Sequence, residues 1–173
     1  MLVKKVAFLT YNKEKTASEN LQIFGPLSYT KIQVVNGMEE GKPNLDLIQS
    51  GDLIVFQRNF LSRFSNYMAV LDRAHKHGIP VVMDLDDTLV GHPQDTPEQR
   101  WSRFAFELPA LMYAIMSVDA ITVTTPTLKS LIEQYNKNVY KLPNFLDDSI
   151  WKFAVKPTQE KQLPVQIAFM STL

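Results

Sequence analysis

Short apolar runs alternate with polar or amphipathic segments along this chain, and each run has the length expected of a buried strand. Six runs precede residue 145, and a seventh begins at Val165. The six are Val6 to Thr10, Thr30 to Val35, Leu53 to Phe56, Pro80 to Asp84, Ala120 to Thr124 and Val139 to Leu142. Strands that alternate with helices favour a parallel sheet with right-handed crossovers. The sequence therefore predicts an α/β, doubly wound, Rossmann-like sheet with helices on both faces.

The segments between these strands repeat apolar residues at helical spacing. A helix ending at Gly78 is expected from Phe64, Met68, Leu71 and Ala74, with His75 and His77 solvated in its last turn. Another, kinked or divided by Pro109, is expected from Trp101, Phe104, Leu108, Leu111, Met112 and Ile115. A third, capped by Thr125, is expected from Leu128, Leu131, Ile132 and Tyr135. Shorter helical segments are expected around Leu21 and Phe24, broken at Gly25-Pro26, and around Leu45 and Ile48.

Composition narrows the class of protein. Hydrophobic residues make up 45% and charged residues 21% of the 173 residues, which is ordinary for a globular domain. Basic and acidic residues balance, so nothing favours nucleic acid as a partner. There is no cysteine and no apolar window long enough to cross a membrane. We expect the first ten residues to form a strand and not a signal peptide, because lysines lie inside their apolar run. We expect a cytoplasmic protein without a transmembrane segment, with peripheral attachment to a membrane left open.

Three carboxylates mark the end of the fourth predicted strand. Asp84, Asp86 and Asp87 follow the apolar run that starts at Pro80, and open α/β sheets place their ligands at the carboxyl ends of strands. Like charges so close repel one another unless a cation, hydrogen-bond donors or protonation relieves them. The alternative is that these aspartates only cap the following turn.

The first family resemblance rests on this motif alone. Asp84, Asp86 and Thr88 resemble the Asp-x-Asp-x-Thr motif of the haloacid dehalogenase superfamily. The resemblance implies a Mg²⁺-dependent phosphohydrolase in which Asp84 is the nucleophile and Asp86 a general acid and base. The remaining residues of such a site would come from Thr124 or Thr125, Lys129 or Lys141, and the pair Asp147 and Asp148.

The second resemblance covers nearly the whole chain. The order of several segments is similar to that in the amino-terminal domain of GT-B glycosyltransferases, which use nucleotide sugars. These segments start at Ala17, Asp52, Gly78, Val118 and Val139, and the last one ends in Pro143-Asn144. The resemblance implies an acceptor-side domain over residues 1–155, then a linker and the first strand of a second, donor-binding domain over residues 156–173, in a chain that continues further. It also implies a role such as polysaccharide biosynthesis.

The GT-B resemblance also implies a site at the strand ends. Its substrate-binding residues would be Thr10, Tyr11, Arg58, Asn59, Asp86, Asp87, Thr125 and Asn144. Asp86 and Asp87 would accept hydrogen bonds from sugar hydroxyls, and Arg58 would meet a phosphate. The partners are a sugar or glycan acceptor and a nucleotide-sugar donor, which is a co-substrate. No cofactor, metal ligand or catalytic residue is assigned. A non-catalytic carbohydrate-binding module is a further alternative.

Overall fold

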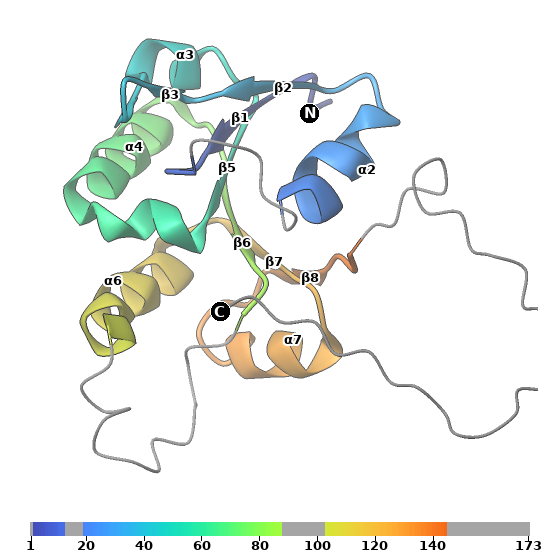
Figure 1. Cartoon of the computed structure of the whole chain (residues 1–173), viewed down its shortest axis with the longest axis vertical. Coiled ribbons are helices and arrows are strands. Elements are labelled where there is room, and N and C mark those ends of the chain that lie inside the picture. Colours follow the sequence, from blue (N-terminus) through green and yellow to red (C-terminus); the bar gives the residue numbers. More distant parts are fainter. Residues whose placement is uncertain (1, 13–18, 88–102, 145–173) are drawn as a thin grey trace, which may run out of the picture.

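The computed structural model describes residues 2–12, 19–87 and 103–144, and six parallel strands form its main sheet (Figure 1). In spatial order they are β2 (Gln33–Asn36), β1 (Lys5–Leu9), β5 (Leu53–Gln57), β6 (Val81–Leu85), β7 (Ala120–Val123) and β8 (Val139–Lys141). All six strands lie within three residues of their predicted bounds. The predicted doubly wound parallel sheet is confirmed. The predicted strand at Val165 and the segment 145–155 lie outside the described residues.

The direction of winding reverses between β1 and β5. The chain leaves β1 to form β2 on one side and returns to form β5 on the other side of β1. From β5 onward every new strand is added in the same direction. The loops after β1 and β5 therefore diverge, and a doubly wound sheet opens a crevice at such a point.

Helices cover both faces of the sheet, as predicted. One face packs against α3 (Leu45–Gln49), α4 (Phe64–His77), α6 (Arg103–Ser117) and α7 (Pro126–Ile132), whose buried residues share one core with the strands. The other face packs against the π-helical turn η1 (Asn20–Phe24) and α2 (Gly25–Ser28). Figure 1 shows α3, α4 and α6 along one side of the sheet and α2 on the other. Alternate residues of β1 serve the two cores: Ala7 and Leu9 point to the larger, Val6 and Phe8 to the smaller.

The buried face of α4 differs from the predicted one. Phe64 is 39% exposed and Met68 is only partly buried, whereas Tyr67, Val70, Leu71 and Ala74 are buried. Tyr67 turns this face inward because its ring packs on Phe56, with centroids 5.4 Å apart, and its hydroxyl lies 2.6 Å from Ser117 Oγ on α6. Tyr67, which was not among the residues that predicted this helix, thus sets its orientation.

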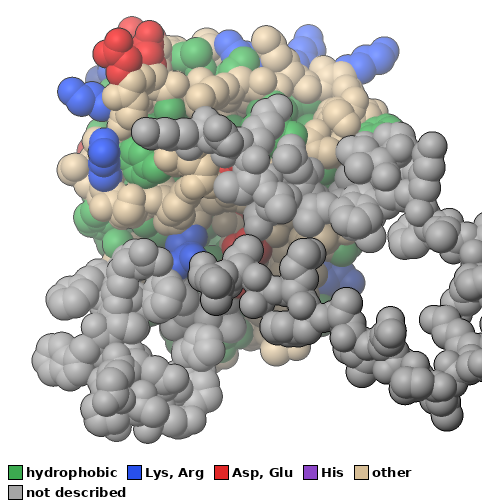
Figure 2. Space-filling model, in the orientation of Figure 1, with side chains coloured by type: hydrophobic (Ala, Val, Ile, Leu, Met, Phe, Trp, Pro, Cys, Tyr) green, Lys and Arg blue, Asp and Glu red, His purple; other side chains and the backbone are tan. Residues whose placement is uncertain are grey.

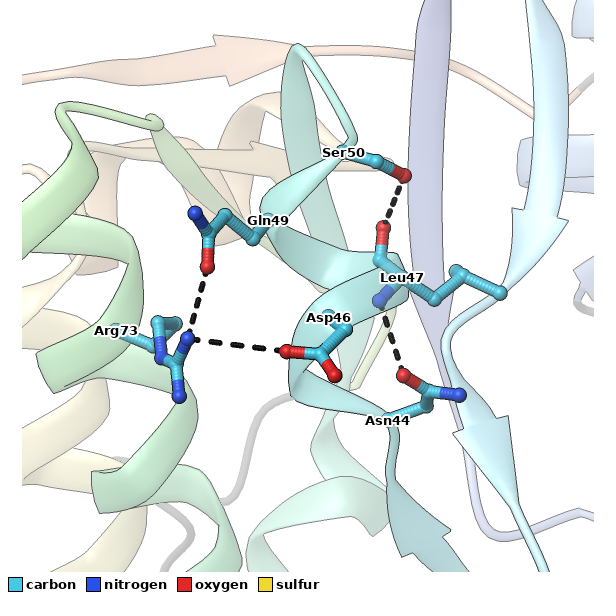
Figure 3. Close-up of polar contacts among 6 residues, drawn as sticks. All are labelled: Asn44, Asp46, Leu47, Gln49, Ser50 and Arg73. Carbon is cyan, nitrogen blue, oxygen red and sulfur yellow. Dashed lines mark hydrogen bonds and ion pairs between the residues drawn. The ribbon is translucent and has the colours of Figure 1, made fainter.

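The ends of α3 and α4 follow the expected rules. Gly78 ends α4 in a left-handed conformation with φ of 65°, and His75 and His77 are exposed in its last turn, as predicted. Asn44 caps α3 by accepting the Leu47 N–H at 2.9 Å. Arg73 Nη1 on α4 donates to Gln49 Oε1 at 2.8 Å and lies 4.0 Å from Asp46 Oδ1, which joins the two helices (Figure 3).

Three other expectations about helices were wrong, for Pro109 only in the alternative that the proline divides the helix. Gly25-Pro26 does not break the helical turns, because Pro26 occupies the first turn of α2, where a proline N–H is not needed. Pro109 does not divide α6, whose buried Leu111 and Ile115 hold it against the sheet on the carboxyl side of the proline. Tyr135 lies beyond the end of α7 and is 41% exposed. Trp101 lies outside the described residues.

A small antiparallel hairpin was not predicted at all. It pairs β3 (Met38–Glu39) with β4 (Lys42–Pro43), and its turn holds Glu40 and Gly41 at positive φ. Strands of two residues carry no periodic signal, so the sequence pattern does not reveal them.

Candidate functional site at the carboxyl edge

Three of the eight predicted site residues line one pocket. Asp86 and Asp87 follow β6, Thr125 follows β7, and all three border a cavity of about 210 Å³. Thr127, Leu128 and Leu131 of α7 complete the lining. The pocket lies at the carboxyl ends of two neighbouring parallel strands, the edge at which open α/β sheets bind ligands.

Local sequence explains how the pocket forms. Strand β6 ends at Leu85, so both aspartates lie immediately beyond its last residue. Thr125 is extended and begins α7 as its N-cap, with its hydroxyl oxygen accepting the Leu128 N–H at 3.2 Å. Leu128 is buried in the larger core and also borders the pocket, so α7 carries an apolar wall opposite the carboxylates.

The lining suits a ligand with both polar and apolar surfaces. Ionised carboxylates accept hydrogen bonds from hydroxyl groups, and threonine hydroxyls both donate and accept. Leu128 and Leu131 offer contact to C–H groups. A sugar ring has this combination of a hydroxyl rim and an apolar face.

Asp84 lies inside strand β6, whose predicted range also included it, and so is separated from Asp86 and Asp87 in the loop that follows. Its side chain is 4% exposed, and Thr122 Oγ1 donates to its Oδ1 at 2.7 Å while Gln57 Nε2 donates to its Oδ2 at 3.3 Å. Burial raises the pKa of the Asp84 carboxyl, the two hydrogen bonds lower it, and the negative charge of Asp86 raises it further. The net shift is upward.

The hydrogen bonds of Asp84 extend into a row of polar side chains across the sheet. Gln57 Nε2 also donates to Gln22 Oε1 at 3.3 Å, and Gln22 Nε2 donates to Asn144 Oδ1 at 3.2 Å. We call Thr122, Asp84, Gln57, Gln22 and Asn144 the polar row. Asn144, predicted to bind substrate, thus lies at one end of this row and does not line the pocket.

Thr10 and Asn59 meet at the crevice between β1 and β5. Asn59 Nδ2 donates to Thr10 Oγ1 at 3.0 Å, and Thr10 Oγ1 donates to Glu19 Oε1 at 2.8 Å. The Asn12 N–H also donates to the Thr10 hydroxyl at 3.2 Å. One donor and two acceptor positions are the full capacity of a hydroxyl, so Thr10 holds the crevice together and has no capacity left for a ligand.

The ring of Tyr11 is covered by other side chains. It stacks on Phe60 with centroids 5.4 Å apart, and the Arg63 guanidinium lies 5.0 Å from its centroid. Its hydroxyl accepts a hydrogen bond from Asn66 Nδ2 at 2.6 Å. Arg58 begins the 3₁₀ turn η2 (Arg58–Ser62), and neither it nor Tyr11 lines the pocket.

Among the described residues, the lysines named for the phosphohydrolase alternative form no hydrogen bond or ion pair with Asp84, whose partners there are Thr122 and Gln57. Lys129 lies 3.5 Å from Glu133 along α7, and Lys141 is exposed on β8. Thr88, Asp147 and Asp148 lie outside the described residues. Within residues 2–12, 19–87 and 103–144, no three or more His, Cys, Asp or Glu side chains are grouped so that they could hold a metal ion.

Searches for known relatives returned no match: no protein-family model fits the sequence, and no curated protein matches it. In the same described ranges, no helix has the length and apolar character that crossing a bilayer requires. On the face in Figure 2, lysine and arginine side chains of the described part are scattered and form no continuous basic patch.

The sequence prediction missed several residues of this edge. Thr127 and Leu131 line the pocket, while Gln22 and Thr122 belong to the polar row. Thr122 carried a usable signal, because it alternates with two buried apolar residues and must point to the opposite face of the sheet. Gln22 carried none, since its contacts depend on packing between distant parts of the chain.

Proposed function

We propose that this chain is the acceptor-side domain of a GT-B type glycosyltransferase, which transfers a sugar from a nucleotide sugar to a carbohydrate acceptor. The observation that carries the proposal is the pocket at the carboxyl edge, where Asp86, Asp87 and Thr125 face the apolar wall of α7. Support also comes from the doubly wound sheet that positions it. The donor nucleotide sugar is assigned to a second domain that follows the described residues.

The carboxylates have a defined role in this proposal. They orient the acceptor sugar by accepting hydrogen bonds from its hydroxyls, while Leu128 and Leu131 contact its C–H face. Orientation of the attacking hydroxyl lowers the barrier to transfer because the reacting groups are already aligned. Asp86 is only partly buried, so a ligand in the pocket can reach it.

Phosphohydrolase chemistry at Asp84 finds less support. A nucleophilic carboxylate must reach phosphorus, yet Asp84 is buried and each of its oxygens accepts a hydrogen bond. A non-catalytic carbohydrate-binding module uses the same pocket as the glycosyltransferase. The two differ only in whether sugar is transferred.

The test is release of nucleoside diphosphate by the protein expressed from its complete reading frame. A panel of UDP- and GDP-sugars is offered with and without a mixture of oligosaccharide acceptors. We expect acceptor-dependent release, and we expect Asp86→Asn and Asp87→Asn to lower it roughly tenfold or more, as loss of an interaction that positions substrate does. Asp72→Asn is the matched control, because Asp72 is an exposed aspartate on α4 outside the pocket lining.

Three results would contradict the proposal. Acceptor-dependent release that is unchanged in both pocket variants would remove the pocket from the reaction. Mg²⁺-dependent hydrolysis of p-nitrophenyl phosphate that is lost in Asp84→Asn would favour the phosphohydrolase instead. Sugar binding without any release would identify a binding module.

A further inference from the structure

The charge of the pocket lining restricts the sugars that fit it. Among the described residues that line it, two are acidic and none is basic: Asp86, Asp87, Thr125, Thr127, Leu128 and Leu131. The nearby Lys129 on α7 is directed to Glu133, with Nζ and Oε1 3.5 Å apart. The described lining thus offers no cation to neutralise an acidic ligand.

The negative potential extends behind the pocket. Burial is the main cause of the raised pKa of Asp84, and the negative charge of Asp86 raises that pKa further. An anionic ligand group placed beside Asp86 and Asp87 would meet the same repulsion from two carboxylates at once. It would also lose hydration against Leu128 and Leu131, which cannot hydrogen-bond to it.

From this lining we propose that the acceptor sugar bound in the pocket is a hexose without an acidic group, so that sugar phosphates and uronic acids are rejected. This inference rests on the proposed function, because it assumes that the pocket is the acceptor site. A neutral ring satisfies the carboxylates through its hydroxyls and the leucines through its C–H face. An amino group on the ring adds attraction to the two carboxylates, so amino hexoses should bind more tightly than neutral hexoses.

A matched series of hexoses tests the inference. Glucosamine, glucose and glucose 6-phosphate share one ring and differ in charge, and their dissociation constants are measured by NMR titration at low salt. We expect glucosamine to bind most tightly and glucose 6-phosphate roughly tenfold more weakly than glucose. The differences shrink in about 0.5 M salt, because salt screens charges that solvent can reach.

Charge removal in the protein gives the control. Asp87→Asn keeps an acceptor oxygen but removes one charge, so it should reduce the ratio between the glucose and glucose 6-phosphate affinities severalfold. Asp72→Asn should leave this ratio unchanged. Glucose 6-phosphate binding as tightly as glucose would overturn the inference while leaving a sugar site in place. Failure of every sugar in the series to bind in the pocket would contradict the proposed function itself.

Discussion

The two edges of the sheet use aspartate in opposite ways. At the amino edge, Asp52 Oδ2 accepts the backbone N–H groups of Lys4 and Lys5 at 2.8 and 2.9 Å, and these bonds hold the pKa of Asp52 below its ordinary value. At the other end of the sheet, the partners of Asp84 among the described residues are the side chains of Thr122 and Gln57, and burial raises its pKa.

This difference indicates that polar residues at one edge of the sheet stabilise the fold, whereas those at the other edge are suited to a function. Amino-edge carboxylates bond to the backbone of the adjacent strand, as Asp119 Oδ2 also does when it accepts the Val81 N–H at 2.7 Å. At the carboxyl edge, the polar row joins side chains from distant segments. Beside it, Asp86, Asp87 and Thr125 border a pocket. Backbone amides are present in any strand, whereas a row of matched side chains has to be specified residue by residue. The carboxyl edge is therefore where we expect ligand recognition.

The largest expected effect on stability comes from Asp84→Ala. This change removes the acceptor for Thr122 and Gln57 at the same time, and a buried donor left without a partner costs about 1–3 kcal/mol. We expect the free energy of unfolding in urea to fall by about 2 kcal/mol. Asp84→Asn retains an acceptor oxygen and should lose less than the alanine variant. A larger loss in the asparagine variant would contradict the role given to the polar row.

The pH dependence of stability should have opposite signs at the two edges. The pKa of Asp52 is lowered from 3.8, so its contribution is present above that value and is lost as the pH falls through the lowered pKa. The pKa of Asp84 is raised from 3.8, so its contribution is present below that value and is lost as the pH rises through the raised pKa.

Both effects can be measured by urea unfolding from acid to neutral pH. The proteins compared are the wild type, Asp52→Asn and Asp84→Asn. The deficit of Asp52→Asn relative to the wild type should be greatest at neutral pH and shrink toward acid. The deficit of Asp84→Asn should be greatest at acid pH and shrink or reverse as the pH rises. If the stability deficits of the two variants changed with pH in the same direction, the proposed difference between the two edges would be contradicted.

A smaller effect is expected where α4 turns toward β6 at the amino edge. Gly78 has φ of 65°, and no atom lies within 4 Å of the position that a Cβ would take. The cost of Gly78→Ala is therefore conformational alone, about 1 kcal/mol in the free energy of unfolding. Sugar binding at the carboxyl edge should be unaffected, and NMR titration with glucose checks this. A changed affinity would show that the two edges are not independent.

Local sequence was sufficient for the frame of the fold. Runs such as Leu53 to Phe56 predicted the strands of the large sheet. In the central strands this follows because a strand buried on both faces must be largely apolar, whereas the edge strands β2 and β8 are partly exposed. The caps at Thr125 and Gly78 were predicted for similar reasons, since cap geometry depends on one residue type at one position.

The site was less accessible to sequence reasoning. Asp86, Asp87 and Thr125 were predicted to meet because adjacent parallel strands end together. Thr10 and Tyr11 were also predicted to bind substrate at that edge. The Thr10 hydroxyl and the Tyr11 ring instead contact other side chains of the protein. No sequence pattern reveals such contacts. The contact of Gln22 with Asn144 joins residues 122 positions apart and arises only from the packing of η1 against the sheet edge.

The most direct test of the central claim is to locate sugar binding by heteronuclear NMR. Backbone amide resonances are followed as glucose and glucosamine are titrated into the protein. The account predicts that shifts concentrate at Asp86, Asp87, Thr125 and Thr127, with the amides of Lys4 and Lys5 unaffected. Shifts centred elsewhere, or no shift at millimolar sugar, would contradict a sugar site at the carboxyl edge.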